Sequence, residues 1–328
     1  MLITGTNGPD SLPGTTSDDE IRGLDGNDTL AGLAGNDLIY GNLGNDVIDN
    51  TTANAAGNDT IYGGQGNDIV GALGAVGNDV IYGNFGDDSL DGGTSSDTIY
   101  GGQGNDFITG GSGSELIYGN LGNDQIFSNA GDDTLYGGQG NDDLSGFGGN
   151  DLIYGNFGND VLSGEAGGGG NDTLYGGQGN DEILSNQADD QDRMFGNLGQ
   201  DTFDFSEFNQ TPPGGVVDDA HSDRIADFQT GVDKIFLDQQ TFSDTTPDYF
   251  EVSAPGATTL AQAIAAANNA SAINGNEVIF VAGATDGYLL INANGDGSIG
   301  GPNEFAIVLE GKNNPNLSDY AATDLVFA

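Results

Sequence analysis

The acids of this 328-residue chain show its clearest chemical pattern. Between positions 10 and 201, an Asp or, once, a Glu recurs with a usual spacing of nine residues. Each acid ends a Gly-rich turn, and the residue two positions after it is always apolar. Carboxylate and backbone carbonyl oxygens, with no His or Cys beside them, suit a hard cation. An irregular oxygen shell favours Ca²⁺ over Mg²⁺. The pattern therefore predicts rows of calcium sites.

Alternate acids form two series, which we call edge A and edge B, because consecutive turns of a coiled chain lie on opposite edges. The edge-A acids are Asp10, Asp28, Asp46, Asp68, Asp88, Asp106, Asp124, Asp142, Asp160, Asp181 and Asp201. The edge-B acids are Asp19, Asp37, Asp59, Asp79, Asp97, Glu115, Asp133, Asp151, Asp172 and Asp192. The departures from nine-residue spacing all precede edge-B acids, namely Asp59, Asp79, Asp172 and Asp192. Insertions are therefore expected on one edge only.

The nine-residue repeat predicts an all-β fold. Strands of about three residues with one inward side chain bury little alone, but stacked in parallel about 4.8 Å apart they form a continuous aliphatic column. Two repeats would make one coil with two facing parallel sheets, and crossover connections of this kind are right-handed. We therefore expect a right-handed parallel β-roll over residues 1–205. A small C-terminal β-rich cap containing one helix is expected over residues 206–328.

The charge balance supports a cation-filled roll. The chain has 51 acidic and only 5 basic residues, a net charge of −46. Such a surface is a poor partner for nucleic acid or an anionic membrane. Stacked like charges also repel unless cations lie between them. Nineteen filled sites would bring the net charge from −46 to about −8, which is ordinary for a soluble domain. Because several edge-B turns are irregular, we expect roughly 14–19 Ca²⁺ ions.

The repeat units resemble a known family. The segments TIYGGQGND, LIYGNLGND and TLYGGQGND are similar to the RTX (repeats-in-toxin) nonapeptide G-G-x-G-x-D-x-U-x, with Asn often in place of a Gly. The resemblance covers about residues 5–205. It implies Ca²⁺ bound between successive turns and export by a type I ABC exporter. Because the acid rows repel one another without Ca²⁺, we expect the chain to fold outside the cell. The alternative is a metal-free Gly/Asn solenoid in which Asp only favours turns, but this would leave the charge rows uncompensated.

The nine-residue repeat ends near residue 205, and the C-terminal region has a different pattern. Residues 223–238 predict two short strands around a Gly turn and are similar to the segment that follows the repeats in RTX proteins. Residues 258–270 predict a helix with a Thr cap, and residues 276–281, 287–291 and 305–310 predict strands. The resemblance places a secretion signal in this region. The side chains of Asn292, Asn294 and Asp296 suggest a further metal loop, for which a hairpin turn is the alternative.

Two further patterns concern the surface. A tyrosine follows most edge-B acids by three residues: Tyr40, Tyr62, Tyr82, Tyr100, Tyr118, Tyr136, Tyr154 and Tyr175. These rings either stack to stiffen the roll or form a contact surface for a partner, a glycan or another copy. In edge-A turns an apolar residue alternates with Gln, which gives a regular apolar array that could specify assembly: Leu43, Phe85, Leu121 and Phe157.

Several function classes lack their motifs. The chain has no Cys, one His (His221), no H-E-x-x-H, no G-x-S-x-G and no Walker-type phosphate loop, so we expect no enzyme. No apolar run is long enough for membrane insertion, and the N-terminus does not resemble a Sec signal. The prediction is a secreted, extracellular or cell-surface structural protein whose partners are Ca²⁺ and a type I ABC exporter. It could also assemble with itself. The alternative is a polysaccharide- or partner-binding module that uses the tyrosine face.

Overall fold

A computed structural model describes residues 1–49, 56–71, 76–164, 169–185, 191–205, 223–229, 233–237, 248–253, 260–269, 277–282, 286–292, 304–310 and 325–327. The chain divides into two compact units, one over residues 1–162 and a second from residue 169 to the C-terminus. We describe each unit by itself. Within the described residues, no helix is both long and apolar enough to cross a membrane.

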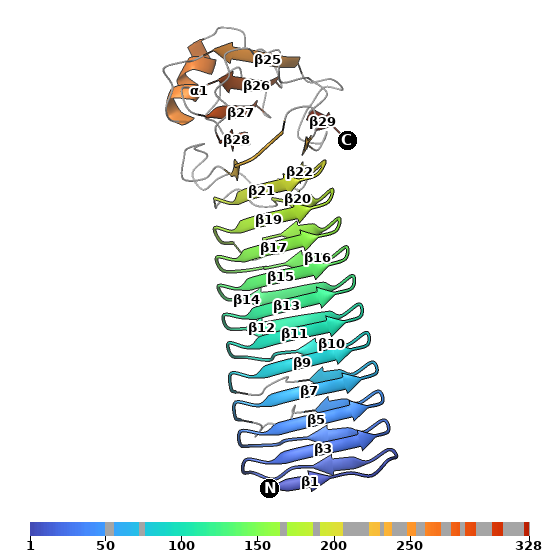
Figure 1. The fold of residues 1–328 in the computed structure, drawn as a ribbon. Helices are drawn as coiled ribbons and strands as arrows, with labels where there is room; N and C mark the ends of the chain where they lie inside the picture. The colour runs from blue at the N-terminus through green and yellow to red at the C-terminus, as the bar shows by residue number, and fades with distance from the viewer. Residues whose placement is uncertain are drawn as a thin grey trace. The chain divides into compact units, whose positions relative to one another are not determined.

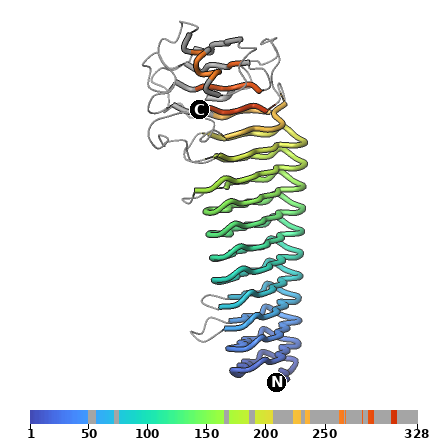
Figure 2. The backbone as a smooth tube through the Cα atoms, turned by 90° about the vertical axis from the view of Figure 1, so that its left-hand side faces the viewer, coloured from blue at the N-terminus to red at the C-terminus, as the bar shows by residue number. Residues whose placement is uncertain are grey.

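The first unit consists of coils stacked one above another (Figures 1 and 2). Each coil contributes one strand to each of two parallel sheets. Sheet A contains β1 (Leu2–Thr4), β3 (Glu20–Asp25), β5 (Leu38–Leu43), β7 (Thr60–Gln65), β9 (Val80–Phe85), β11 (Thr98–Gln103), β13 (Leu116–Leu121), β15 (Thr134–Gln139) and β17 (Leu152–Phe157). Sheet B contains β2 (Ser11–Pro13), β4 (Thr29–Ala31), β6 (Val47–Asp49), β8 (Ile69–Gly71), β10 (Ser89–Asp91), β12 (Phe107–Ser112), β14 (Gln125–Ala130) and β16 (Asp143–Ser145), with β18 (Val161–Ser163) ending the unit.

The core of this unit is the predicted aliphatic column. Neighbouring strands pair in register, so that Ile81, Ile99 and Ile117 lie one above another in sheet A. Each of these side chains has no exposed surface. The facing column in sheet B includes Leu90 and Ile108, which are equally buried. One inward residue per strand is enough because each coil covers the residue of the coil before it.

The second unit continues the same architecture. One sheet contains β19 (Thr173–Gln178), β21 (Arg193–Leu198), β23 (Arg224–Ile225), β28 (Glu304–Leu309), β27 (Gly287–Asn292), β26 (Glu277–Ala282) and β25 (Asp248–Ser253) in spatial order. The other contains β20 (Glu182–Leu184), β22 (Thr202–Asp204), β24 (Lys234–Leu237) and β29 (Leu325–Phe327). Pairing is parallel except for the β26–β27–β28 meander, which is antiparallel.

The one helix within the described residues, α1 (Leu260–Asn269), contacts β26 and β27 of the meander. Ala263 and Ala267 of α1 lie in a buried cluster with residues that include Val281, Leu290 and Val308. The predicted helix and the three predicted strands of this region are thus confirmed. The hairpin strands β27 and β28 pair Asn292 with Glu304. The suggested metal loop at Asn294 and Asp296, the Thr cap of the helix and His221 lie outside the described residues.

The fold class is confirmed as an all-β parallel β-roll with a small C-terminal part that contains one helix. The two short strands predicted within residues 223–238 are β23 and β24. They do not pair with each other. Instead, β23 stacks on β21 and β24 stacks on β22, so this segment forms one further coil.

Candidate metal centre

The acids of edge A form a hydrogen-bonded row within the first unit. The backbone N–H of each acid donates to Oδ1 of the acid one coil later, as from Asp88 to Asp106 at 2.9 Å and from Asp106 to Asp124 at 2.8 Å. The same bond links every successive pair from Asp10 to Asp160 at 2.8–2.9 Å. One oxygen of each carboxylate after Asp10 is therefore held by the backbone N–H of the preceding coil.

Edge B has an equivalent row. Asp19, Asp37, Asp59, Asp79 and Asp97 are linked in order at 2.8 Å. The links from Asp37 to Asp59 and from Asp59 to Asp79 span 22 and 20 residues, yet their distances equal those of the uninterrupted repeats. Insertions before edge-B acids are therefore accommodated without disturbing the carboxylate row.

The second oxygen of the central acids has no hydrogen-bond donor. These acids are at most 3% exposed, and the oxygen itself is buried. In the first unit the oxygens concerned are Oδ2 of Asp28, Asp37, Asp46, Asp68, Asp79, Asp88, Asp97, Asp106, Asp124, Asp133 and Asp142. A buried carboxylate oxygen without a partner is costly, and a bound cation removes that cost.

Glycine shapes the space around each of these oxygens. A Cβ atom added at Gly119 would collide with Oδ2 of Asp124 and would lie 2.6 Å from the carbonyl oxygen of Gly137, one coil later. The equivalent position at Gly101 brings together Oδ2 of Asp106 and the carbonyl oxygen of Gly119. Only a residue without a side chain leaves this cradle open, and the atoms that converge on it are all acceptors. Acceptors without donors suit a cation.

Burial also shows in the acidity of the central carboxyl groups. Loss of solvation raises the pKa of Asp68, Asp88, Asp106 and Asp142 to about 7, against an ordinary value of 3.8. The backbone N–H that each group accepts lowers the pKa, but by less than burial raises it. Without a counter-ion these groups therefore hold their protons near neutral pH, or the fold bears the cost of their charge.

A second ladder runs in the opposite direction beside each acid row. The residue before the acid, usually Asn, donates its backbone N–H to a side-chain oxygen one coil earlier. Examples on edge A are Asn123 to Asn105 at 2.9 Å and Asn141 to Asn123 at 2.7 Å. Each Asn-Asp pair is thus bonded to both neighbouring coils. This explains the recurring Asn, to which the sequence analysis gave no role.

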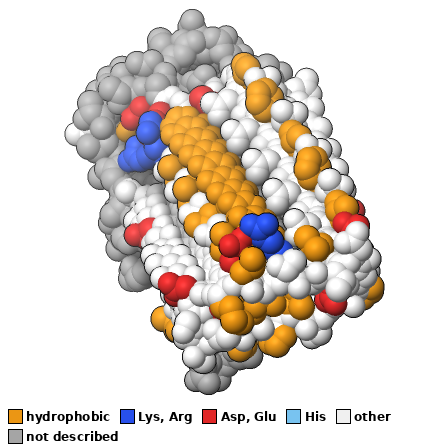
Figure 3. Space-filling model, turned by 60° about the horizontal axis from the view of Figure 1, so that its bottom comes forward, with side chains coloured by type: hydrophobic (Ala, Val, Ile, Leu, Met, Phe, Trp, Pro, Cys, Tyr) orange, Lys and Arg blue, Asp and Glu red, His pale blue; other side chains and the backbone are white. Residues whose placement is uncertain are grey.

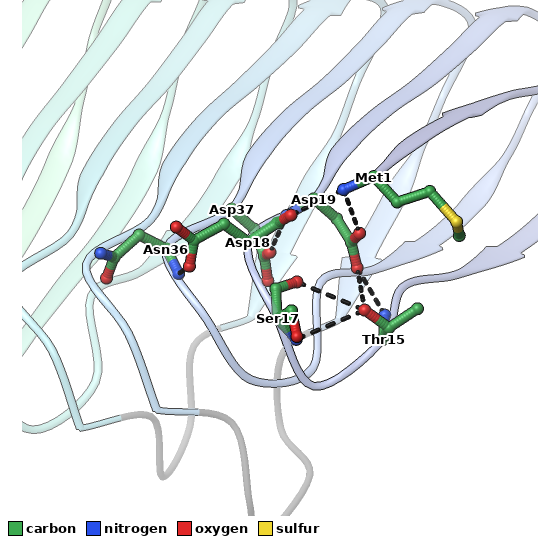
Figure 4. Close-up of polar contacts among 7 residues, drawn as sticks. All are labelled: Met1, Thr15, Ser17, Asp18, Asp19, Asn36 and Asp37. Atoms are coloured by element: carbon green, nitrogen blue, oxygen red, sulfur yellow. Dashed lines mark hydrogen bonds and ion pairs between the residues drawn. The ribbon is translucent and has the colours of Figure 1, made fainter.

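The first two turns satisfy their carboxylates differently. Oδ2 of Asp19 accepts the backbone N–H of Thr15 at 2.6 Å and its hydroxyl at 2.8 Å (Figure 4). Oδ1 of Asp19 pairs with the N-terminal amine of Met1 at 2.7 Å. Oδ2 of Asp10 likewise accepts both donors of Thr6, at 2.6 and 2.9 Å. A threonine four residues before the acid therefore supplies what the central turns lack.

Glu115 is the one Glu in the two rows, and its longer side chain changes the site. Both of its carboxylate oxygens are buried without a donor. Its carboxyl group lies near that of Asp133, and burial, followed by this neighbour, raises the pKa of Glu115 to about 9. The backbone of Glu115 keeps its place, because its N–H donates to Oδ1 of Asp133 at 2.7 Å. Only the side chain departs from the row.

The rows extend further than the sequence analysis recognised. In the second unit, Asp192 donates its N–H to Oδ1 of Asp223 at 3.0 Å, and Asp201 donates to Oδ1 of Asp233 at 3.2 Å. Oδ2 of Asp233 accepts the N–H of Gln229 at 2.6 Å, and Oδ2 of Asp223 accepts the hydroxyl of Ser185. The spacings of 31 and 32 residues hid these acids from a nine-residue count. The apolar residue two positions after each, Ile225 and Ile235, was the available signal.

The geometry fits Ca²⁺ held between turns. The described residues contain no compact group of three or more His, Cys, Asp or Glu side chains. A cation here would therefore take one carboxylate oxygen from a turn and complete its shell with backbone carbonyl oxygens. Hard cations accept such an all-oxygen shell, and Ca²⁺ tolerates its irregularity better than Mg²⁺.

The predicted surface rows are both present. In the first unit the rings from Tyr40 to Tyr154 stack in parallel, with centroids 4.8–5.1 Å apart and planes within 3–6°. They form a continuous hydrophobic stripe on the face drawn in Figure 3. In the second unit Tyr175 stacks on Phe195 at 4.4 Å. Stacking is thus confirmed as one role of the tyrosines, and the half-buried rings keep part of their surface exposed.

Comparison with known proteins identifies the repeat. The family model of the RTX calcium-binding nonapeptide repeat (4 copies) matches residues 4–39, 13–48, 55–72, 73–108, 109–144, 136–167, 145–183 and 166–191. A similar solved structure is the solution structure of the AlgE6R3 subunit from the Azotobacter vinelandii mannuronan C5-epimerase. It is 25% identical, with 60% of this chain and 78% of that chain covered and a TM-score of 0.30. No match to a curated protein was found. The family model spans more than half of the sequence, and the chain therefore belongs to the RTX family, whose nonapeptide repeats bind calcium.

Proposed function

We propose that this chain is a secreted, calcium-dependent structural protein of the bacterial surface, as part of a surface layer, sheath, fibre or adhesive matrix. The observation that carries this proposal is the row of buried carboxylate oxygens without donors that runs through the central coils. All the buried acids of the described residues lie in these rows. The protein would then act through its calcium-dependent shape, without catalysis.

The same rows supply a switch between two states. In a cytoplasm with little free Ca²⁺, unneutralised carboxylates disfavour the stacked coils, so the chain would remain unfolded and fit for a type I ABC exporter. Outside the cell, millimolar Ca²⁺ would fill sites with dissociation constants of about 10⁻⁴–10⁻³ M. Metal binding then contributes folding free energy directly.

The proposal assigns different roles to two parts of the chain. Residues 1–205 would form the calcium-dependent roll, and residues 206–328 would cap it and carry the secretion signal. Support for a cap comes from the antiparallel meander β26–β27–β28 and the helix α1, which bury their own apolar cluster. A solenoid end of this kind protects the last coil from solvent and from other edges.

Cell fractionation tests the lead proposal. Antibodies raised against the protein would be used on cytoplasm, cell surface and medium of the producing cells, with and without a calcium chelator. We expect the protein on the surface or in the medium, and we expect chelation to release the surface-held part. Protein found only in the cytoplasm would overturn the proposal.

A second candidate function rests on the tyrosine row. The stacked rings expose their edges and hydroxyl groups, which can contact and hydrogen-bond sugars, so the row could bind a cell-surface polysaccharide. A pull-down with insoluble polysaccharides in Ca²⁺ tests this candidate. Replacing Tyr100, Tyr118 and Tyr136 by Thr, which stands at the matching position 109 of sheet B, should abolish retention. Equal retention of this variant would contradict it.

A further inference from the structure

The edge-A turns of the first unit carry an exposed row of uncharged side chains. We call it the edge-A ridge, and it consists of Leu43, Gln65, Phe85, Gln103, Leu121, Gln139 and Phe157. Its apolar members are exposed despite their size: Leu43 by 42%, Phe85 by 49%, Leu121 by 41% and Phe157 by 51%. Exposed large apolar groups in a regular array mark a contact surface more often than scattered ones do.

Strand register spaces these groups evenly. Leu43 pairs with Gln65, Gln65 with Phe85 and Phe85 with Gln103, and the same alternation continues to Phe157. One ridge residue therefore belongs to each coil, and an apolar group recurs every second coil, about 10 Å apart. Figure 3 shows hydrophobic groups alternating with other side chains in a row beside the tyrosine stripe.

Hollows lie between the apolar groups. A depression of about 440 Å³ is lined by residues that include Leu43, Gly64, Gln65, Asn84 and Phe85. A second, of about 410 Å³, is lined by Gln139, Gly140, Phe157 and Gly158. Coils with Gly-Gly-Gln turns thus leave space beside coils whose turns carry Leu or Phe. The two hollows thus lie beside Gln65 and Gln139, next to the apolar members of the ridge, and Asp25 also lines the first.

The edge-A ridge is unusual for this acidic chain because its turns expose almost no charged side chains. From residue 41 to residue 159, the exposed positions of the edge-A turns are Gly, Asn, Gln, Leu or Phe, with Asp87 as the exception. The edge-A acids themselves are buried. In a chain with a net charge of −46, this is a surface that another acidic chain can approach without repulsion.

We propose that the edge-A ridge binds the edge-A ridge of a second copy of this chain. In a two-fold antiparallel arrangement, the Leu and Phe side chains of one copy enter the hollows of the other, because both surfaces have the same two-coil period. The proposal commits to a second copy because such a partner carries matching apolar groups and the same neutral strip. It deepens the proposed structural function and rests on it.

The edge-A ridge is narrow, so we expect two copies to bind each other weakly. Stable interfaces bury about 800 Å² per partner, and a strip one turn wide offers less. We therefore expect a weak dimer that forms in Ca²⁺ at high micromolar protein. Weak contacts of this kind suit an array in which many copies hold one another.

Sedimentation in Ca²⁺ over a range of protein concentrations tests this proposal. The variant Leu43→Gln, Phe85→Gln, Leu121→Gln and Phe157→Gln should weaken the association constant at least about tenfold. The chain itself supplies the reason to expect folding, since Gln occupies the same turn position at Gln65, Gln103 and Gln139. If the fourfold variant fails to fold, Phe85→Gln with Phe157→Gln replaces it.

A matched control removes exposed apolar surface elsewhere. Ile69 and Phe107 are 52% and 42% exposed, and Gln125 occupies the equivalent strand position. The Ile69→Gln, Phe107→Gln variant should associate like the wild type. A monomeric wild type, a ridge variant with unchanged association, or a control that is equally weakened would each overturn the proposal. Circular dichroism of the same samples reports calcium-dependent folding, so failure of the structural function is seen separately.

Discussion

In the turns that end at Asp10 and Asp19, a threonine four residues earlier donates a backbone N–H and a hydroxyl to the second carboxylate oxygen. In the central turns, such as those that end at Asp106 and Asp124, the corresponding oxygen lies beside a glycine of its own turn but has no donor. The first oxygen of the central acids is bonded to the neighbouring coil in the same way throughout.

This difference shows where the roll depends on metal. In the first two turns, Oδ2 of the acid accepts hydrogen bonds from the protein. In the second unit, Oδ2 of Asp223 and Oδ2 of Asp233 do so as well. The central turns contain an acceptor without a donor in every coil, next to backbone carbonyl oxygens. Calcium demand is therefore expected to be concentrated in the central turns.

Removal of Ca²⁺ should have the largest effect. At pH 7.5, a chelator should remove most of the β-sheet signal in far-ultraviolet circular dichroism, because many carboxylates would have to be buried without a counter-charge. Restoring Ca²⁺ should restore the signal. An unchanged β-sheet spectrum in chelator would contradict the contrast between central and terminal turns.

Protonation of the central carboxyl groups at low pH should stabilise the fold in place of Ca²⁺, although only in part. Burial in the metal-free fold raises the pKa of Asp88 and Asp106 from 3.8 to about 7. Because these values are raised, the metal-free fold is most stable below pH 4 and loses this stability as the pH rises through about 7. In chelator, the β-sheet signal should therefore increase as the pH falls from 8 to 5. A signal that increases with pH would be inconsistent with these shifts.

Single substitutions should lower calcium binding in the central turns but not in the first two turns. Asp106→Asn keeps an oxygen that can accept the N–H of Asp88 but removes the charged oxygen that would hold the ion of this turn. We expect about one fewer Ca²⁺ bound and a loss of roughly 3 kcal/mol of stability in excess Ca²⁺. Calorimetric titration and thermal unfolding measure both quantities.

Asp10→Asn is the matched control for this substitution. The carboxylate of Asp10 is already satisfied by Thr6, so the number of bound ions should stay the same. Equal losses of calcium at Asp10 and Asp106 would show that the threonine has no bearing on metal demand.

Replacement of Glu115 by Asp should raise the stability of the fold, and by less than Asp106→Asn lowers it. Glu115→Asp should return the carboxylate to the row, where it can accept the N–H of Asp97 as its neighbours accept theirs. A hydrogen bond to a charged group contributes about 1.5–3 kcal/mol, so the thermal midpoint in Ca²⁺ should rise by several degrees. A lower midpoint would indicate that Glu115 suits its site better than Asp.

Loss of the threonine donor should have the smallest effect. Thr15→Val removes the hydroxyl bond to Asp19 but keeps the backbone bond and the shape of the side chain. We expect a loss of about 1 kcal/mol in denaturant unfolding and no change in calcium stoichiometry. A larger effect than that of Asp106→Asn would reverse the proposed order.

The sequence predicted the features that depend on local repetition. The inward column, the two edges and the tyrosine row follow from nine-residue spacing and alternation, whereas the two strands in residues 223–238 were predicted from a Gly turn and from the resemblance. The same reasoning missed Asp223 and Asp233, because their ladder contacts span more than 30 residues. The role of Thr6 and Thr15 was also missed, since only the folded turn brings their hydroxyls to the carboxylate.

Anomalous diffraction from crystals grown in Ca²⁺ tests the central claim most directly. The account predicts calcium about 2.3–2.6 Å from Oδ2 of central acids such as Asp88, Asp106 and Asp124, with backbone carbonyl oxygens of the neighbouring turn completing the shell. It predicts no ion at Oδ2 of Asp10 or Asp19, which threonine donors already satisfy. Central turns without ions, with Oδ2 bound only by water or protein donors, would contradict it.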